Sequence, residues 1–281
     1  MQNHIQTYEP DNCLKQGYFS IFRQIVNEIK ESKWLIYQLF KRDFSATYRQ
    51  SVFGLLWVIL IPVIGIAGVF LLSRSNIIDI GKTPVSFLLY SVSGLAIWQI
   101  FSVGLVSATS SLAKAGPMIV KINFSKKALV ISAFSQCFVP FLVLFAVALL
   151  LCPGEGVKFS AVTLLFPFLL IPLILFTLGL GFLLALLNGL MRDIGNAVSV
   201  LVTFLMFFTP IFYAAPKAGS FYYAIKYNPL YYLIIVPRDA LLAGSLEHLL
   251  AYYMAAILSV IVFVFCIAVF HITETRIAER I

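Results

Sequence analysis

The sequence predicts an all-α integral membrane protein with six transmembrane helices. All twenty Lys and Arg and all twelve Asp and Glu lie outside six long stretches, each able to hold the roughly 20 residues that a helix needs to cross a bilayer. Hydrophobic residues make up 61% of the chain and charged residues 11%, and the mean hydropathy is +0.97. The expected spans lie within residues 50–73, 83–113, 128–154, 159–191, 194–216 and 248–273.

The distribution of Lys and Arg orients these spans. With both termini in the cytoplasm, the inner segments hold 14 Lys and Arg and the outer segments hold 6, as the positive-inside rule requires. The net charge of +8 is therefore interpreted as topology and contact with anionic lipid, and not as nucleic-acid binding. We expect a polar N-terminal extension (1–17), a cytoplasmic interface and gate helix region (18–49), a transmembrane domain (50–273) and a cytoplasmic tail (274–281).

Residues 18–33 predict an amphipathic helix that lies in the cytoplasmic interface. Tyr18, Phe22, Ile25 and Ile29 follow helical spacing, and charged residues largely occupy the other side. The segment carries too many charges to span a bilayer, which favours a helix along the membrane surface. The alternative is an amphipathic helix packed on a soluble partner.

A cytoplasmic segment at 112–127 separates the second and third spans. Gly116-Pro117 can break the chain direction there, and the following PMIVKINF is apolar apart from one Lys. Apolar residues in a cytoplasmic loop are expected to be buried against another molecule, which favours a helix at about 112–124 that docks a soluble protein. The alternative is a short helix on the membrane surface. The candidate docking residues are Gly116, Pro117, Met118, Ile119 and Lys121.

The fourth span has features that predict a kink and close packing. Pro167 and Pro172 can kink it, and small residues recur every fourth position at Gly181, Ala185 and Gly189. Only Arg192-Asp193 separates the fourth span from the fifth, which predicts a tight cytoplasmic turn.

The outer segment 217–247 is apolar, but its charge-free runs are too short to cross a membrane. Pro229 and Pro237 interrupt it, so we expect a pair of short helices, at about 217–245, that enter the outer leaflet and return. Asn228, Pro229 and Arg238 are its marked residues. A surface-lying amphipathic segment is the alternative.

The sequence offers no catalytic, cofactor-binding or metal site. Gly81-Lys82-Thr83 resembles the end of a nucleotide-binding loop, but Asn76 stands where the first glycine belongs. The three histidines are far apart, and no charge lies inside a span, which argues against an ion-coupled carrier. The chain is expected to be a conduit that draws its energy from elsewhere.

Four motifs stand in order along the chain: RDFSATYRQSVFGLLW (42–57), LNGLMRDIGN (187–196), FFTPIFY (207–213) and NPLYYLIIVPRDALLAG (228–244). Together they resemble the motifs of ABC-2-type exporter permeases, in the branch that exports lipid-linked polysaccharides such as O-antigen, capsule and teichoic acid. The resemblance covers about residues 18–272, and the first two motifs are the more specific.

The resemblance implies a homodimeric permease in a bacterial inner membrane, paired with two ATP-binding cassette subunits encoded as separate chains. ATP and Mg would be bound by those subunits, so this chain would be no enzyme and would carry no cofactor. The complex would move a lipid-linked glycan, with O-antigen the first choice, from the cytoplasmic leaflet across the membrane. The segment at 112–124 would then be the coupling helix.

A pathway for a sugar polymer favours aromatic faces and few fixed charges. The candidate pore-lining residues have helical spacing and are Phe53, Trp57, Phe204, Phe207, Phe208 and Phe212; the alternative is that they face lipid or a neighbouring helix. Lys41, Arg42 and Arg49 lie near the cytoplasmic entrance and could attract the pyrophosphate of a lipid carrier, although topology alone also places cations there.

Two other functions stay open from the residues. One is an ABC-2 permease for a small hydrophobic drug or lipid, which shares the fold. The other is a membrane-embedded glycosyltransferase, which would need paired acidic residues at a membrane face. Asp43, Asp193 and Asp239 approach the membrane, but without a paired motif.

Overall fold

The computed structural model describes residues 18–48, 53–75, 81, 83–119, 125–157, 159–215 and 219–277, which contain helices and no strand. The helices are α2 (Tyr18–Glu31), α3 (Lys33–Tyr48), α4 (Leu56–Arg74), α5 (Phe87–Ile119), α6 (Lys126–Ser135), α7 (Phe138–Leu151), α8 (Phe166–Leu169), α9 (Ile171–Leu190), α10 (Asp193–Phe208), α11 (Ser220–Lys226), α12 (Pro229–Leu242) and α13 (Leu249–Ile277). The predicted all-α class is confirmed.

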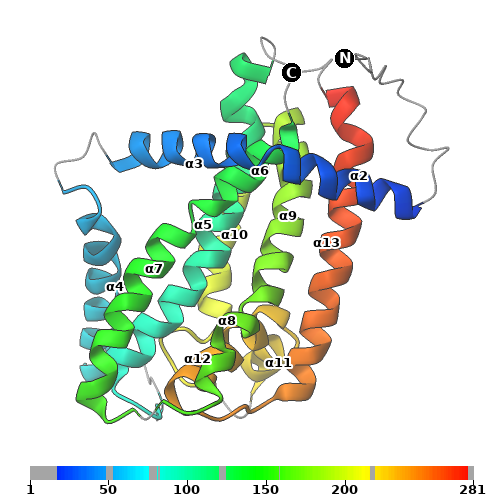
Figure 1. The fold of residues 1–281 in the computed structure, drawn as a ribbon. Helices are drawn as coiled ribbons and strands as arrows, with labels where there is room; N and C mark the ends of the chain where they lie inside the picture. The colour runs from blue at the N-terminus through cyan, green and yellow to red at the C-terminus, as the bar shows by residue number, and fades with distance from the viewer. Residues whose placement is uncertain are drawn as a thin grey trace.

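The bundle is centred on α5 and α9, which pack against each other, while α13 covers α9 and α7 covers α5 (Figure 1). Glycines allow the closest approaches. A Cβ at Gly181 would lie 2.7 Å from the Ala108 Cβ in α5, and a Cβ at Gly179 would lie 2.7 Å from the Phe263 Cα in α13. The predicted close packing at Gly181 is confirmed, and Gly179 provides a second contact that the four-residue pattern did not include.

Among the described residues, five helical segments are long and apolar enough to cross a membrane. They are Leu56–Arg74, Phe87–Ala115, Lys126–Glu155, Thr163–Leu190 and Leu249–Glu274. They fall in five of the six predicted spans. The fourth is broken between α8 and α9 at Leu170, close to the two prolines that predicted a kink.

The fifth predicted span is shorter than the charge-free stretch 194–216 suggests. It contains α10, whose 16 residues extend about 24 Å, less than the ~30 Å of a hydrocarbon core. The helix ends at Phe208 because Thr209 precedes Pro210, and a residue before proline is pushed out of the helical region; Thr209 has φ −114° and ψ 116°. The stretch therefore contains a helix, as predicted, but the helix ends before the charge-free run does.

Helices α2 and α3 lie across one end of the bundle, nearly at right angles to the long helices (Figure 1). They meet at Ser32, and α2 buries Ile25 while its predicted apolar residue Phe22 stays 47% exposed. The predicted helix is therefore present. Its place in a membrane interface remains a prediction.

Helix α5 runs through Gly116 and Pro117 to Ile119, so the predicted break at this pair is wrong. Proline removes one helical hydrogen bond, but Ala113, whose carbonyl would have accepted it, is only partly buried and can bond to water. The last turns of α5 project beyond the layer formed by α2 and α3 (Figure 1). Lys121 and the rest of the predicted docking segment after Ile119 lie outside the described residues.

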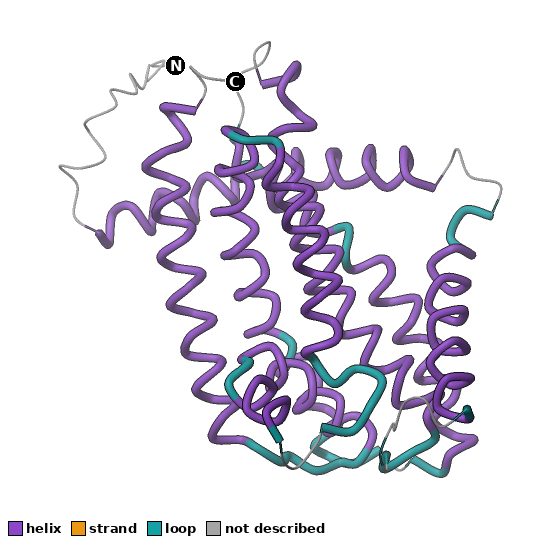
Figure 2. Tube along the Cα trace, turned by 180° about the vertical axis from the view of Figure 1, so that it is seen from behind, coloured by secondary structure: helices purple, strands orange, loops and turns teal. Residues whose placement is uncertain are grey.

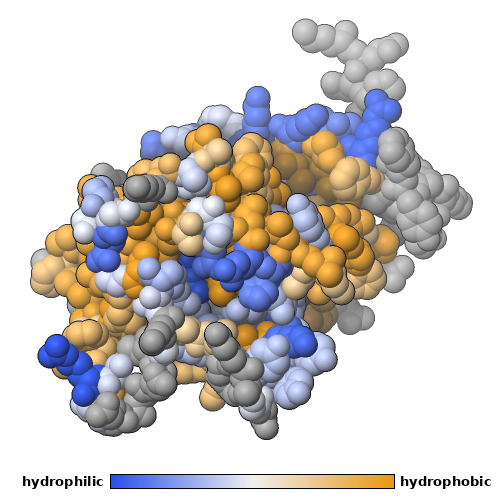
Figure 3. Space-filling model, turned by 90° about the horizontal axis from the view of Figure 1, so that it is seen from below, coloured by the Kyte–Doolittle hydropathy of each residue, from blue (hydrophilic) through white to orange (hydrophobic). Residues whose placement is uncertain are grey.

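The opposite end of the bundle carries α11 and α12, the pair of short helices that the outer segment predicted. Connecting loops gather at this end (Figure 2). Seen end-on, it shows hydrophilic residues near its middle with hydrophobic surface around them (Figure 3). How deeply the pair enters a membrane remains a prediction.

Candidate functional site

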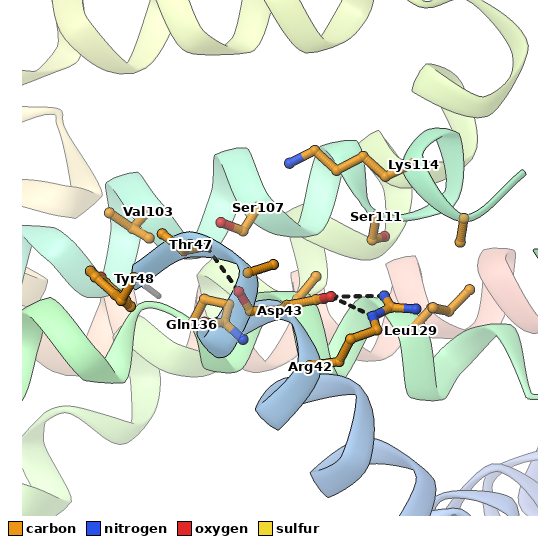
Figure 4. Close-up of a pocket in the computed structure, with 13 residues that line it drawn as sticks. Arg42, Asp43, Thr47, Tyr48, Val103, Ser107, Ser111, Lys114, Leu129 and Gln136 are labelled. Carbon is orange, nitrogen blue, oxygen red and sulfur yellow. Dashed lines mark hydrogen bonds and ion pairs between the residues drawn. The ribbon is translucent and has the colours of Figure 1, made fainter. Parts of the chain in front are cut away.

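A cavity of about 310 Å³ lies between α3, α5 and α6, at the end of the bundle that carries the α2–α3 layer. This volume is at the lower end of the roughly 300–1,000 Å³ that ligand pockets enclose. Figure 4 shows the residues around it. They are Arg42, Asp43, Ala46, Thr47, Tyr48, Val103, Ser107, Ser111, Lys114, Ala115, Leu129, Ala133 and Gln136.

Among the described residues, two cations and one anion line the cavity. Arg42 pairs with its neighbour Asp43, with Nη2 lying 2.8 Å from Oδ1. Lys114 is exposed and makes no ion pair with a described residue. The lining is therefore cationic by one charge, which suits an anionic group.

Hydroxyl groups complete the polar lining, and they differ in what they can offer a ligand. Ser111 donates to the Ala108 carbonyl (2.6 Å) and Thr47 to the Asp43 carbonyl (2.9 Å), so both are committed as donors. Burial raises the pKa of Tyr48, which keeps its phenol neutral and able to donate. Ser107 lines the same wall of α5 one turn before Ser111.

Gln136 anchors α3 against the break between α6 and α7. Its Nε2 donates a 3.0 Å hydrogen bond to the Phe40 carbonyl in α3. The cavity wall formed by α3 is thus held in place from the side of α6.

The cavity includes one of the three cations predicted for the substrate entrance. Arg42 lines it, Lys41 is exposed outside it, and Arg49 lies outside the described residues. Sequence reasoning missed Ser107, Ser111, Lys114 and Gln136. Ser107 and Ser111 are four residues apart, with Lys114 one turn further, so helical spacing carried a signal for the α5 wall.

The predicted pathway aromatics are mostly exposed. Phe204, Phe207 and Phe208 are 60%, 61% and 41% exposed, whereas α10 buries Val198 and Val202. Phe212 follows the end of the helix and packs on the core, so the predicted four-residue spacing does not extend to it.

At the start of α4, the first predicted aromatic pair stays exposed, with Phe53 preceding the helix and Trp57 in its first turn. Phe53 and Trp57 lie edge to face with ring centres 5.5 Å apart. The helix itself buries only Pro62 and Ile66 among its residues, so it presents broad apolar faces. What faces these aromatics remains a prediction.

At the opposite end of the bundle, Asn228 makes hydrogen bonds to the ends of two helices. Its Oδ1 accepts from the Leu230 amide (3.0 Å) and caps α12, next to Pro229 at the first helical position. Its Nδ2 donates to the Phe208 carbonyl (3.3 Å), the last of α10. Asn228 therefore joins the end of α10 to the start of α12.

Arg238 is fully buried (0% exposed) between α12, α5 and the chain that follows α10. It donates to the carbonyls of Pro210 (3.2 Å) and Ile211 (3.3 Å) and to the Tyr90 hydroxyl (2.6 Å). These bonds fix the irregular backbone after Phe208, where helical hydrogen bonds are lost. Sequence analysis singled out Asn228 and Arg238 in the outer segment, but it did not predict their hydrogen-bond partners.

The turn between α9 and α10 is held by Asn188, which sequence reasoning missed. Its Oδ1 accepts from the Gly195 amide (2.7 Å) and its Nδ2 donates to the Thr109 carbonyl in α5 (3.1 Å). The predicted turn residues Arg192 and Asp193 are both exposed. The turn is as tight as predicted, but the residue whose hydrogen bonds hold it is Asn188, four residues before Arg192.

A metal ligand set was not expected, yet Glu28, His271 and Glu274 bring ligand atoms within 4.8 Å of one another. The ammonium of Lys127 contacts both carboxylates, with 2.7 Å to Glu28 Oε2. A built-in cation therefore occupies the position that a metal ion would take.

Comparison with known proteins identifies relatives along most of the chain. A family model described as "ABC-2 type transporter" matches residues 35–242. The chain is 28% identical over 194 residues to "O-antigen export system permease protein RfbA" of Myxococcus xanthus, covering 68% of this chain and 72% of the relative. It is 26% identical over 254 residues to a protein of the same name from Klebsiella pneumoniae, covering 87% and 94%.

Proposed function

Because the chain belongs to the ABC-2 type transporter family, we propose that it is the permease subunit of an ATP-driven exporter of a lipid-linked polysaccharide. The observation that carries this proposal is the similarity over 87% of the chain to a relative named as an O-antigen export permease. The first choice of substrate is an O-antigen-like glycan, moved outward from the cytoplasmic leaflet of a bacterial inner membrane.

The cavity beside α3 is the proposed entrance for the substrate headgroup. A lipid pyrophosphate is doubly anionic, and Arg42 and Lys114 supply cations against the single carboxylate of Asp43. Ser107 and Tyr48 can add hydrogen bonds to phosphate oxygens. The lipid tail would remain in the bilayer beside the apolar helices.

The energy for transport is proposed to come from a separate ATPase subunit. Two copies of this chain and two ATPase subunits would form the exporter, with ATP and Mg bound by the ATPase. The end of α5 at Met118 and Ile119 projects beyond the α2–α3 layer, where a soluble subunit can reach it. The aromatic side of α10 would face the glycan pathway between the two copies.

Stimulation of ATP hydrolysis tests the entrance. The complex of permease and ATPase is mixed with a lipid-pyrophosphate-linked oligosaccharide, and ATP hydrolysis is measured against the oligosaccharide concentration. We expect stimulation by this lipid and a higher half-maximal concentration for Lys114→Gln. The matched control is Lys33→Gln, which removes an exposed cation outside the cavity. Stimulation by hydrophobic drugs or ordinary phospholipid, and none by the glycolipid, would contradict the proposal.

A further inference from the structure

A group of charged side chains that the proposed entrance does not use joins three distant parts of the chain. Lys127, in the first turn of α6, is fully buried (0% exposed). Its ammonium lies 2.7 Å from Glu28 Oε2 in α2 and also contacts Glu274 Oε1 near the end of α13. Three helices that are remote in sequence therefore meet at one nitrogen atom.

Neighbouring groups strengthen the connection to α13. Lys126 donates through Nζ to the backbone carbonyl of Glu274. His271, one turn earlier in α13, lies with Nδ1 3.5 Å from Glu274 Oε1, and its side chain is 4% exposed. Glu274 is thus tied to the first two residues of α6, and His271 contacts the same carboxylate from within α13.

Local stability does not explain why a lysine occupies this position. A cation at a helix N-terminus opposes the helix dipole, and α6 has no side-chain cap there. A buried ion pair also stabilises a fold less than well-packed apolar residues of the same size. Removal of either carboxylate would leave the buried ammonium with one charged partner instead of two.

The position of Lys127 in the chain indicates what the contact can transmit. Ile119 ends α5 beyond the α2–α3 layer, and α6 begins at Lys126, so a few residues connect the proposed ATPase contact to the buried ammonium. A displacement of the start of α6 carries Lys126 and Lys127 with it. From there it passes to α2 through Glu28 and to α13 through Glu274.

We propose that Lys127 is a positioning residue of the transport cycle, which makes α2 and the end of α13 move together with the start of α6. This inference rests on the proposed function, in which a separate ATPase subunit supplies the energy for the motion. It adds α13 to the helices that the ATPase would move. Glu28 and Glu274 both lie outside the range matched by the family model, residues 35–242.

The test measures glycan export per ATP hydrolysed by the assembled complex. Lys127→Met and Glu28→Gln each remove one charge, and we expect export per ATP to fall by about fivefold or more while hydrolysis continues. Combining Lys127→Glu with Glu28→Lys again places one cation between two carboxylates and should restore the ratio. The control is Lys30→Gln, an exposed cation in α2.

A parent-like ratio in assembled Lys127→Met or Glu28→Gln complexes would overturn the inference, as would a charge-exchanged complex that assembles without recovering the ratio. Glu28 keeps 26% of its side chain exposed, so Glu28→Gln carries the test if Lys127→Met does not fold.

Amide hydrogen exchange separates this inference from the choice of substrate, because it needs no glycan. In the parent complex, nucleotide should change exchange in α2, the end of α5 and the end of α13 together. In Glu28→Gln, the change in α2 should be lost and the change in α5 retained. An unchanged response of α2 overturns the role of the ion pair, whereas a parent complex that hydrolyses ATP and moves no glycan contradicts the proposed function alone.

Discussion

The guanidinium carbon of Arg238 in α12 lies 3.7 Å from the centre of the Tyr90 ring in α5, and Nη2 donates a 2.6 Å hydrogen bond to the Tyr90 hydroxyl. The hydroxyl in turn donates to the Tyr213 carbonyl at 3.4 Å. The residues are 148 positions apart, and the pair connects the short outer helices to the centre of the bundle. A buried cation held by an aromatic face and carbonyl oxygens needs no carboxylate partner.

Replacing Arg238 with Met should loosen the outer end of the bundle. The carbonyls of Pro210 and Ile211 lose their donors, and we expect a loss of stability of about 3 kcal/mol. Thermal unfolding of the purified protein in detergent measures the effect. Arg74→Met is the control, since Arg74 is an exposed cation over the Phe70 ring (5.7 Å) and should leave the unfolding temperature nearly unchanged. Equal shifts in both variants would contradict the role of Arg238.

Replacing Asn188 with Ala should release the turn between α9 and α10. The Gly195 amide and the Thr109 carbonyl lose their partner, at an expected cost of about 1–3 kcal/mol. Trypsin should then cleave faster after Arg192, which the exposed turn presents. The matched variant Asn196→Ala removes an exposed amide from the same helix. If both variants are cleaved at the same rate, Asn188 does not hold the turn.

Cysteine labelling tests the orientation in the membrane. In a variant without the four natural cysteines, Tyr227→Cys places a thiol at the α11–α12 end and Arg192→Cys places one at the opposite end, both at exposed positions. A membrane-impermeant reagent should label residue 227 in right-side-out vesicles and residue 192 only after the vesicles are opened. The reverse pattern would invert the topology.

Removing the exposed aromatics of α10 should slow export of long glycans. Phe204, Phe207 and Phe208 offer ring faces that bind sugars weakly and without dependence on sequence, so changing all three to Ala should lower surface polysaccharide per assembled complex. The control changes Ile257, Ile261 and Phe265 of α13 to Ala, which are likewise exposed and apolar. Parent-like export by the α10 variant would place these rings against lipid or a neighbouring helix.

Hydropathy and charge spacing were enough to predict the bundle, because each span must satisfy its backbone internally and exclude charge. Thr209-Pro210 carried a local signal for the end of α10, but the absence of charge as far as residue 216 outweighed it. Gly116-Pro117 predicted a break in the chain direction, yet α5 continues through both residues to Ile119. Charge-free length therefore predicts where a span lies better than where its helix ends.

The contacts that join the site could not be predicted from the sequence. Sequence analysis singled out Arg238 and Asn228. Their hydrogen-bond partners lie as far as 148 positions away, and residue spacing does not predict them. Lys127 gave no signal at all, since a lysine beside a span is what positive-inside topology also places there. Its burial follows from Glu28 and Glu274, at opposite ends of the chain, meeting α6 in the folded protein.

The central claim is that this chain, with an ATPase subunit, moves a lipid-linked glycan across a membrane. The most direct measurement reconstitutes the permease–ATPase complex in vesicles that contain a fluorescent lipid-pyrophosphate-linked oligosaccharide, and follows the appearance of its glycan on the opposite face after ATP is added. We predict ATP-dependent translocation of this lipid, no translocation by the permease alone, and slower translocation in the Lys114→Gln variant. Movement of a hydrophobic drug or an ordinary phospholipid, with the glycolipid left in place, would contradict the account.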